Sequence, residues 1–448
     1  MKTKRLLGIM LACLAAFSCS KHDSNDVPTL KGEPTWVSIS LGKNRTYASS
    51  VGSTGAEKKI NTVDIFLFTP DATPANSVLA KHVSFGVGQL SPTANGQATE
   101  AFQTTTAEQY MVVIVNAPGA YKAAITAKGS ALTLGDFTTG DLSTLVTSTL
   151  AGFSTDYANV TLGSESFMMV NTNPTTKISF PLQHDRGALS PFPVQVERIV
   201  SKVEVWCDAN IRTTNFLANN TVIDGVDKEI QSIDVLLDNQ NKKSFVLPNQ
   251  GTSGNPSGPV FVDPNYQQVL SPNTANEFFA SIPDGTSQWV NIHNGAPLAT
   301  ATPFYCFENT IEQDHNVATK FALESNATNL ILRMRLNGGS DFYMTRTGRL
   351  TTNGSHPEGI WYTYTGGYCY YRIYIQRPDA KIIASNPVTD EYGMERNRLY
   401  EVNIKEIRSL GSSTVAALQD KPILTGNLLN VDIQVKDWIL QTNTVIIP

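Results

Sequence analysis

Residues 429–448 end the chain with the sequence LNVDIQVKDWILQTNTVIIP. Leu429, Val431, Ile433 and Val435 alternate with polar residues, and this period of two is typical of a strand with one buried face. A second apolar run, 445–447, follows just before the last residue. Termini are usually the frayed part of a domain. A terminus with the pattern of a strand must instead pair with a neighbour, either in its own domain or in another molecule.

Similar apolar runs recur along the whole chain, whereas helical periodicity is scarce. β-Branched and aromatic residues fill these runs, and segments rich in Gly, Ser, Asn and Pro separate them. The sequence therefore predicts an all-β fold built of antiparallel sandwiches, with short helical pieces only near residues 142–150 and 309–323. The predicted strands are WVSISL (36–41), VDIFLF (63–68), YMVVIV (110–115), VQVERIVSKVEVW (194–206), SIDVLL (232–237), LILRMRL (330–336), YYRIYI (370–375) and LYEVNI (399–404).

The length and charge of the chain limit its organisation and its partners. With 448 residues, a prior of about 150 residues per domain suggests two or three domains. A loop-like segment at 181–193 precedes a long strand pattern, so we place a domain boundary near residue 196. The net charge is only −5. This small value argues against a nucleic-acid-binding protein, which would present a basic face.

The first eighteen residues have the features of an export signal. Basic residues precede a short apolar stretch that is too short to span a bilayer as a helix. The stretch ends at Phe17-Ser18-Cys19, which looks like a bacterial lipoprotein signal, so Cys19 is the predicted site of lipidation. An ordinary secretory signal with an incidental cysteine is the alternative. A lipid anchor of this kind holds a protein on a membrane without spanning it.

Residues that carry chemistry do not form catalytic or metal-binding patterns in this sequence. The six histidines are isolated, and the motifs of zinc proteases, serine hydrolases and phosphate loops are missing. Cys207, Cys306 and Cys369 remain after processing, far apart and outside any CxxC, which allows at most one disulfide. They are expected to be buried small hydrophobic residues. We therefore predict that the protein is not an enzyme and has no cofactor or metal.

One aromatic cluster, WYTYTGGYCYYRIYI (361–375), leaves two interpretations open. Aromatic rings with polar tips can stack on sugars, so the cluster could be a glycan-binding platform. Alternation within 370–375 instead indicates that at least one face belongs to the core. A surface lipoprotein that binds glycans is accordingly the alternative function.

A second alternating strand lies near the N-terminus and precedes a basic segment. Val37, Ile39 and Leu41 share one face of WVSISL, and GKNRT (42–46) follows directly. A trypsin-like protease would cut after Lys43 or after Arg45, and the second cut leaves a chain that begins at Thr46. Such a cut separates the first strand from the rest of the chain.

Loss of a strand from a sheet has two physical consequences. Each aliphatic side chain that leaves the core forfeits roughly 1.5–3 kcal/mol of burial, and the open edge can accept another strand. The tail has the matching alternation at Leu429, Val431, Ile433 and Val435. Its insertion into a second molecule would be donor-strand complementation. The alternative is that both ends are ordinary terminal strands and that Arg45 is a surface arginine.

A set of motifs along nearly the whole chain resembles the fimbrillins, the type V pilins that are the major fimbrial subunits of Bacteroidales. Individually each motif is weak, but their order is that of the family. They are the lipoprotein signal ending at Cys19, WVSISL before a basic cut site, INTVDIFLF (60–68), QYMVVIVNAP (109–118), SFMMVN (166–171), VERIVSKVEV (196–205), FYCFENT (304–310), GGYCYYRIYI (366–375), MERNRLYEVNIKEIRSLG (394–411) and LNVDIQVKDW (429–438).

The resemblance implies two transthyretin-like β-sandwich domains in tandem, at 46–196 and 197–448, behind a lipidated propeptide at 19–45. It also implies export as an outer-membrane lipoprotein, maturation by an arginine-specific protease, and assembly with other subunits into cell-surface fimbriae that support adhesion. In this scheme the strand of Val37, Ile39 and Leu41 is removed and the tail 429–448 is the donor. A cut site together with a strand-like tail favours a stalk subunit over an anchor or a tip subunit.

Overall fold

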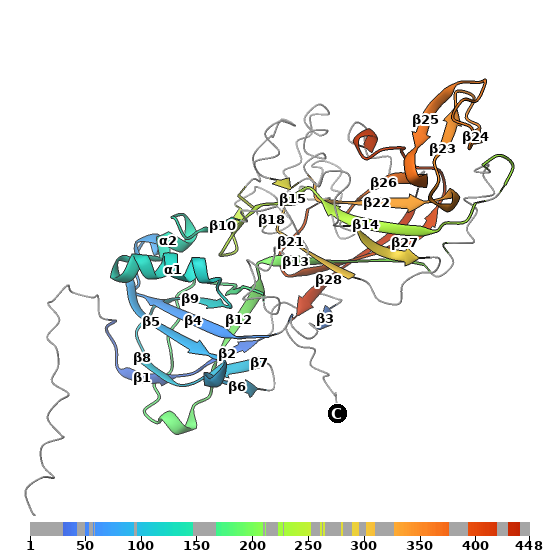
Figure 1. Cartoon of the computed structure of the whole chain (residues 1–448). Helices are drawn as coiled ribbons and strands as arrows, with labels where there is room; N and C mark the ends of the chain where they lie inside the picture. Colours follow the sequence, from blue (N-terminus) through green and yellow to red (C-terminus); the bar gives the residue numbers. More distant parts are fainter. Residues whose placement is uncertain are drawn as a thin grey trace, which may run out of the picture.

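The chain consists almost entirely of β-strands (Figure 1), which confirms the all-β fold class. No helix in the described part is long and apolar enough to cross a membrane. The computed structural model describes residues 30–42, 50–52, 57, 59–93, 96–146, 167–208, 211, 223–226, 228–251, 260–261, 263–264, 279–280, 289–294, 302–309, 327–375, 393–418 and 429–439.

An eight-stranded sheet of order β5-β4-β9-β11-β12-β2-β7-β6 collects strands from the first two hundred residues. Phe66 and Phe68 of β4 belong to one hydrophobic cluster, and Val63, Ile65 and Leu67 belong to another. Both faces are buried, which explains why the predicted strand VDIFLF is nearly continuously apolar. The strands are β2 (Ile39–Gly42), β4 (Thr62–Phe68), β5 (Leu79–Gly86), β6 (Leu90–Thr93), β7 (Gly96–Thr99), β9 (Tyr110–Val115), β11 (Met169–Asn171) and β12 (Phe192–Arg198); β1 (Pro34–Val37) pairs with β8 (Phe102–Thr105).

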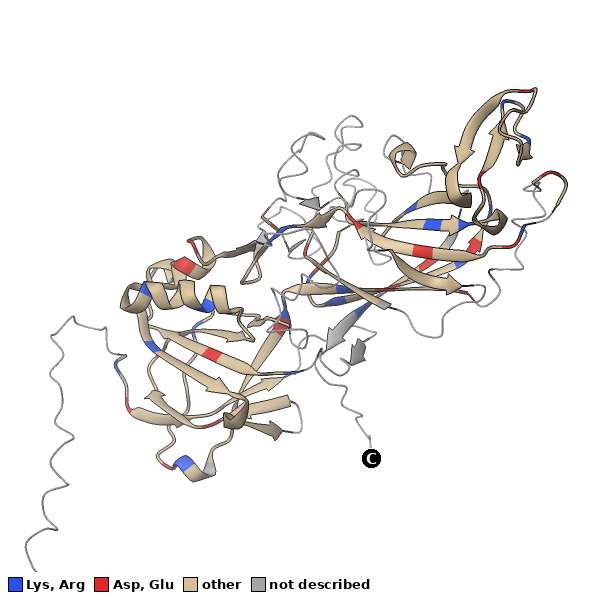
Figure 2. Cartoon of the chain, in the orientation of Figure 1, with Lys and Arg blue, Asp and Glu red and all other residues tan. Residues whose placement is uncertain are grey.

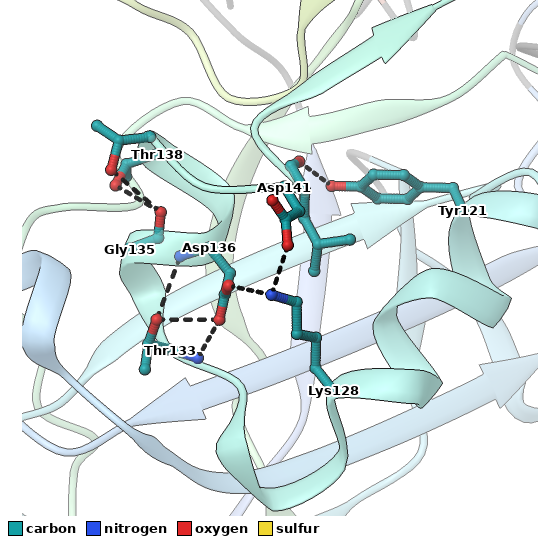
Figure 3. Close-up of polar contacts among 9 residues, drawn as sticks. Tyr121, Lys128, Thr133, Gly135, Asp136, Thr138 and Asp141 are labelled. Atoms are coloured by element: carbon teal, nitrogen blue, oxygen red, sulfur yellow. Dashed lines mark hydrogen bonds and ion pairs between the residues drawn. The ribbon is translucent and has the colours of Figure 1, made fainter.

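Two short helices, α1 (Gly119–Lys128) and α2 (Leu134–Thr138), pack on this sheet and were not predicted from the sequence. Figure 3 shows how polar contacts join them: Lys128 Nζ lies 2.8 Å from Asp136 Oδ1 and 2.9 Å from Asp141 Oδ2. The Thr133 side chain accepts a hydrogen bond from the Asp136 N–H and caps α2. Burial alone would raise the pKa of Asp136, but the hydrogen bonds from Lys128 and Thr133 outweigh it and lower that pKa.

The expected helix near 142–150 is wrong where the structure describes it. Residues Thr144–Val146 form strand β10, which pairs with β16 (Lys243–Phe245). Of the second expected helix, Asn309 lies in an isolated β-bridge with Met394, and residues 310–323 are outside the described part. Single 3₁₀ turns occur at η2 (Pro74–Asn76), η3 (Val87–Gln89), η4 (Gly129–Ala131), η6 (Arg186–Ala188), η7 (Asn337–Gly339), η8 (Thr365–Gly367) and η9 (Ala416–Leu418).

The later part of the chain forms a five-stranded sheet of order β21-β13-β27-β28-β3 and a four-stranded sheet of order β20-β14-β22-β26. A three-stranded sheet, β24-β23-β25, projects beyond them (Figure 1). The bounds are β3 (Ser50–Gly52), β13 (Val200–Cys207), β14 (Ser232–Asp238), β20 (Val290–Asn294), β21 (Thr302–Phe307), β22 (Asn329–Arg335), β23 (Phe342–Thr345), β24 (Leu350–Thr351), β25 (Ile360–Tyr364), β26 (Tyr368–Tyr374), β27 (Arg398–Ile407) and β28 (Leu429–Ile439); short pairs join β15 (Gln240–Asn241) to β19 (Phe279–Ala280) and β17 (Gln250–Gly251) to β18 (Val260–Phe261).

The long strand pattern at 194–206 is two strands rather than one. β12 ends at Arg198 in the eight-stranded sheet, and β13 begins at Val200 in the five-stranded sheet. Ile199, which separates them, is fully buried. It belongs to a hydrophobic cluster whose members come from both parts of the chain, from Phe66 of β4 to Leu429 of β28. The chain therefore passes from the eight-stranded to the five-stranded sheet within a single residue. The limits of the two domains, 46–196 and 197–448, stay a prediction.

Charged residues of both signs are interspersed along the strands of both parts (Figure 2), in keeping with the small net charge. No described group of three or more His, Cys, Asp or Glu residues could hold a metal ion.

Candidate assembly site

Strand β2 occupies an inner position of the eight-stranded sheet. It pairs in parallel with β12, with Ile39 opposite Phe192, and antiparallel with β7, with Leu41 opposite Gln97. Ile39 and Leu41 are each 0% exposed, and Val37, at the end of β1, is 4% exposed. All three belong to the hydrophobic cluster that also contains Val63, Ile65 and Leu67 of β4. The residues that the sequence placed on one face thus lie in the core, and β2 holds two parts of the sheet together.

Hydrogen bonds also fix this segment in place at its two strand partners, through side chains toward β7 and through the backbone toward β12. Ser38 Oγ donates a hydrogen bond to the Thr99 carbonyl at 2.7 Å, and the Ile39 N–H donates one to Thr99 Oγ1 at 3.0 Å. On the other side, the Phe192 N–H donates to the Ser38 carbonyl at 2.7 Å. Ser38 lies between β1 and β2, so these bonds satisfy the backbone where the strand pattern WVSISL breaks into two strands.

Gly96, the first residue of β7, approaches β2 too closely for any side chain. A Cβ atom there would lie 1.9 Å from the Leu41 carbonyl oxygen, and φ is +152°, a conformation that residues with a side chain rarely adopt. The contact shows how tightly β7 packs against the end of β2.

Removal of β1 and β2 would therefore leave a vacancy inside the sheet rather than a shortened edge. β12 would lose its partner on one side, and β7 would lose its partner on the other. The three aliphatic side chains would take with them about 1.5–3 kcal/mol of burial each, and both strands would expose unpaired N–H and C=O groups. Such a groove is complementary to one extended, alternating strand.

The predicted cut lies in the connection between β2 and β3. Gly42 ends β2 and Ser50 begins β3 on the five-stranded sheet. Lys43, Arg45 and Thr46 themselves lie outside the described residues, as does the predicted lipidation site Cys19. The connection thus links a strand of one sheet to a strand of the other.

Glu57, which follows β3 in the chain, contacts residues of both the eight-stranded and the five-stranded sheet. Arg198 Nη2 donates a hydrogen bond to the Glu57 carbonyl at 2.9 Å, and Lys202 Nζ lies 2.6 Å from Glu57 Oε1. Tyr305 donates from its hydroxyl to the same carboxylate at 2.9 Å. Burial lowers the pKa of the Arg198 guanidinium to about 9, and the Glu57 charge opposes that shift. This cluster was not predicted from the sequence, because its members lie far apart along the chain.

The tail strand β28 pairs within its own chain. It runs antiparallel to β27 from Leu429, opposite Ile407, to Asp437, opposite Arg398, and its last three residues pair in parallel with β3. Leu429 is buried. Val431 and Ile433 are partly buried and pack against the hydrophobic cluster that contains Phe66, Phe68 and Leu429. Val435 lies on the same strand, opposite Tyr400. The sequence left the partner of this strand open between its own domain and another molecule, and among the described residues its partners are β27 and β3 of the same chain.

The other face of β28 is polar and carries ion pairs. Asp432 Oδ2 lies 3.0 Å from Lys405 Nζ of β27, with both side chains more than two-fifths exposed. Lys436 pairs with Glu401 of β27. Alternation along β28 thus separates a core-facing side from a solvent-facing one, as the sequence predicted.

The aromatic cluster at 361–375 divides into a buried and an exposed part. Tyr364, Tyr370, Tyr371 and Tyr374 are buried, which confirms the core interpretation for these rings. Trp361 and Tyr362 are 61% and 40% exposed, and their rings stack with centroids 5.0 Å apart. A bulge in β25 explains their proximity, since Tyr362 pairs with Met344 and Ile360 with Thr345, which leaves Trp361 without an opposite residue.

A serine, a histidine and an aspartate meet on β4 and β5, although His82 was expected from the sequence to be isolated. Ser84 Oγ lies 2.5 Å from Asp64 Oδ1, and His82 Nε2 lies 3.3 Å from the same oxygen and 3.1 Å from Ser84 Oγ. In a catalytic triad the carboxylate and the serine contact different nitrogens of the ring, whereas here both contact Nε2. Lys122 of α1 adds an ion pair to Asp64 at 2.9 Å, so the cluster ties the helix to the sheet.

The three remaining cysteines are buried free thiols. Burial raises the pKa of each thiol, to about 12 for Cys207 and Cys369. At neutral pH they are protonated and unreactive, which agrees with the expectation that they serve as small hydrophobic residues.

Two protein-family models match this chain, one in its first half and one in its last quarter. Residues 35–183 match the family described as major fimbrial subunit protein (FimA), and residues 362–444 match the family described as major fimbrial subunit protein type IV, fimbrillin, C-terminal. Together the two matches cover about half of the chain. No curated protein sequence matches it.

The comparison with solved structures also gave several matches. A fimbrilin from Porphyromonas gingivalis W83 is 13% identical over 93% of this chain and 100% of its own, with a TM-score of 0.48. A putative cell adhesion protein from Parabacteroides distasonis ATCC 8503 is 15% identical over 91% of this chain and 99% of its own, with a TM-score of 0.48. The tip fimbrial protein Mfa3 from Porphyromonas gingivalis, with a C-terminal truncation, is 15% identical over 91% and 100%, with a TM-score of 0.40.

Proposed function

Because the chain belongs to the fimbrillin family of major fimbrial subunits, and is thus a structural protein rather than an enzyme, we propose that it is a stalk subunit matured by proteolysis. In this proposal it is exported as an outer-membrane lipoprotein through Cys19 and cut by an arginine-specific, trypsin-like protease. It then polymerises by donor-strand exchange into surface fimbriae that support adhesion, together with anchor or tip subunits.

The inner position of β2 is the observation that carries this proposal. A terminal strand at the edge of a sheet could leave without opening a groove, whereas β2 separates β12 from β7 and buries Ile39 and Leu41 completely. The basic segment follows its last residue directly. A cut after Arg45 would disconnect β1 and β2 from the remainder of the chain, and their departure would leave a groove matched to a strand.

The tail 429–448 supplies the donor in this proposal, and its two parts differ in what they could give. Leu429, Val431 and Ile433 already contribute to the core of their own chain, so their departure would cost burial there. Residues 440–448 follow β28 and contain the second apolar run, 445–447. We therefore assign insertion to residues 440–448, with β28 as the stem that carries them.

The N-terminal mass of cell-surface material tests the maturation step. A chain that begins at Thr46 supports the pilin, whereas a chain that retains lipidated Cys19 supports an anchored protein. Arg45→Ala should leave lipidated monomer and no fibres. Lys43→Ala is the matched control and should leave fibre yield unchanged if the cut follows Arg45. Normal polymer from Arg45→Ala would contradict the proposed bond.

Two variants of the tail separate its inserted part from its stem. Deletion of residues 440–448 should abolish fibres and leave a folded monomer, because β28 keeps its pairing with β27. Ile433→Asp places an unpaired charge against the core, so its main effect should be on the stability of the monomer. Loss of fibres from Ile433→Asp with no loss of monomer stability would instead identify β28 itself as the inserted strand.

A second function is favoured by one specific observation, the exposed pair Trp361 and Tyr362. Their rings stand on the projecting three-stranded sheet, and a bulge brings them together. We propose that this pair is where a glycan would stack. Trp361→Ala should then lower glycan retention while Tyr364, buried in the same strand, stays in place. Unchanged retention by Trp361→Ala would remove this candidate.

A further inference from the structure

Strand β1 has a neighbour on each side, although only one of the two is a strand. On one side, β8 pairs with β1 along its whole length. On the other side, the Trp36 N–H donates a hydrogen bond to the Gln183 carbonyl at 3.0 Å. The segment 181–186, which precedes β12 along the chain, therefore covers the edge of β1 that faces away from β8.

The hydroxyl of Thr35 binds this segment to β1. Thr35 Oγ1 donates a hydrogen bond to the Pro181 carbonyl at 2.8 Å, and it accepts one from the Gln183 N–H, also at 2.8 Å. The residue is only 1% exposed, so water cannot readily replace either bond. A hydroxyl oxygen can donate and accept at the same time, which is why a threonine can hold two backbone groups here. Without it, both groups would lose this partner.

The ring of Trp36 provides a further contact with the same segment. The guanidinium of Arg186 lies over this ring, with Cζ 5.3 Å from the ring centroid, and a cation in this position is attracted to the face of the ring. Arg186 begins the 3₁₀ turn η6, where the Asp185 side chain accepts a hydrogen bond from the Gly187 N–H at 2.7 Å. Trp36 is thus held through both its backbone and its side chain.

The segment 181–186 is a surface loop whose flanking residues are anchored in the core. Phe180, before it, is 2% exposed, and Phe192, after it, packs partly buried against the same hydrophobic cluster. The two rings meet edge to face with centroids 5.0 Å apart. All residues of 181–186 except Gln183 are exposed, and the loop is drawn in green next to β1 in Figure 1. Opening it would break contacts with β1 but none of the pairings between strands.

We propose that the loop 181–186 is a latch that retains β1 and β2 after the chain has been cut. The inference rests on the proposed function, in which these strands leave the sheet. A cut between β2 and β3 breaks none of the contacts of Thr35 and Trp36. Release of the strands is then a step separate from cleavage. The latch keeps the groove filled until a strand from a second copy of this chain replaces β1 and β2, so the cut chain does not expose an open edge to other strands.

The rate at which the cut fragment is released tests the latch. In a full chain whose residues 43–45 are replaced by the recognition sequence of a site-specific protease, digestion separates the fragment that ends at residue 45 from the rest. Size-exclusion chromatography with mass detection then follows its release, with an excess of the peptide PTWVSISLG (34–42) present to prevent rebinding. The fragment with Thr35 should co-elute with the rest of the chain. Thr35→Val should speed release by about tenfold or more, because it leaves buried backbone groups without their partner.

Three further variants separate the latch from a general weakening of the fragment. Thr35→Ser keeps the hydroxyl and should keep release slow. Ser40→Ala, in β2 of the same fragment, removes a hydroxyl that has no hydrogen bond among the described residues, so release should change by no more than about twofold. Arg186→Ala removes the ring contact from the exposed loop and should speed release about two- to fivefold. Its urea unfolding before the cut should match that of the unsubstituted chain.

Two outcomes would overturn the proposal. One is immediate release of the fragment with Thr35 on digestion, and the other is release from Thr35→Val no faster than from Ser40→Ala. Because the cut is made at an engineered site and no fibre has to form, neither outcome depends on whether Arg45 is the natural cut site or on whether the protein polymerises. The fibre yield of Arg45→Ala tests the proposed function separately.

Discussion

Strands β2 and β28 show the same sequence pattern and occupy opposite kinds of position. Both alternate aliphatic and polar residues, and both place their aliphatic side chains against a core. β2 pairs with β12 from Ile39 to Gly42 and with β7 at Ser40 and Leu41, and Ile39 and Leu41 are fully buried. Among the described residues, β28 has one long partner, β27, and a second partner, β3, at its last three residues. The comparison teaches that the number of partners, and not the alternation, decides whether loss of a strand leaves a vacancy or an edge.

Truncation of one isoleucine in each strand should give the largest difference. Ile39→Ala should lower the free energy of unfolding by about 2–5 kcal/mol, since it opens a cavity in a fully packed site. Ile433→Ala should cost about 1–2 kcal/mol, because partly exposed side chains contribute less burial. Urea denaturation of both variants measures the two values. Equal losses would show that β28 is as deeply integrated as β2.

The side-chain hydrogen bond between β2 and β7 should give the next largest effect. Thr99→Val keeps the shape of the side chain but removes Oγ1, the acceptor for the Ile39 N–H. A buried donor left without a partner costs about 1–3 kcal/mol, so the free energy of unfolding should fall by that amount. Thr105→Val is a control on β8, because the Thr105 hydroxyl has no hydrogen-bond partner among the described residues. A loss from Thr99→Val no larger than that from the control would mean that β2 does not depend on the bond.

The eight-stranded sheet should also lose stability in acid through Asp64. Burial alone would raise the pKa of this carboxyl, but hydrogen bonds from His82, Ser84 and Lys122 and the charge of Lys122 together lower it. A folded pKa below the unfolded value of about 3.9 means that the stabilisation is present above that pH and is lost as the pH falls through the folded pKa.

Unfolding of the wild-type chain and of Asp64→Asn, measured from pH 6 to pH 2, checks this expectation. The wild type should lose stability more steeply below about pH 4 than the variant, whose amide does not titrate. Ser84→Ala should give an intermediate slope, since it removes one of the hydrogen bonds to Asp64. Parallel curves for the wild type and Asp64→Asn would show that this carboxyl does not link the sheet to pH.

The smallest effect is expected on the solvent face of β28. Lys405→Ala removes the ion pair with Asp432, and both side chains are more than two-fifths exposed. Surface pairs of this kind contribute about 0–1 kcal/mol and are screened by salt. Thermal unfolding at low and high salt should therefore differ little between variant and wild type. A loss above this range would indicate that the polar face of β28 contacts more than solvent.

Strands were predictable from this sequence, whereas the helices and side-chain clusters were not. All eight predicted strand patterns form strands, although those that include Ser38 and Ile199 each break in two. Helices α1 and α2 are short and contain Gly and Thr, so most of their stability comes from packing of residues such as Tyr121 and Phe137 on the sheet. Asp64 and Ser84 meet because β4 and β5 pair with these two residues opposite each other.

The sequence by itself determined which residues of β2 and β28 face a core, because side chains alternate from one face of a strand to the other whatever the neighbour is. Only the tertiary structure decided the neighbours, with β12 and β7 beside β2 and with β27 and β3 beside β28. The physical reason is that a strand's edges consist of backbone N–H and C=O groups, which are the same in almost every residue and can pair with any strand. The partner is therefore selected by the packing of the whole chain.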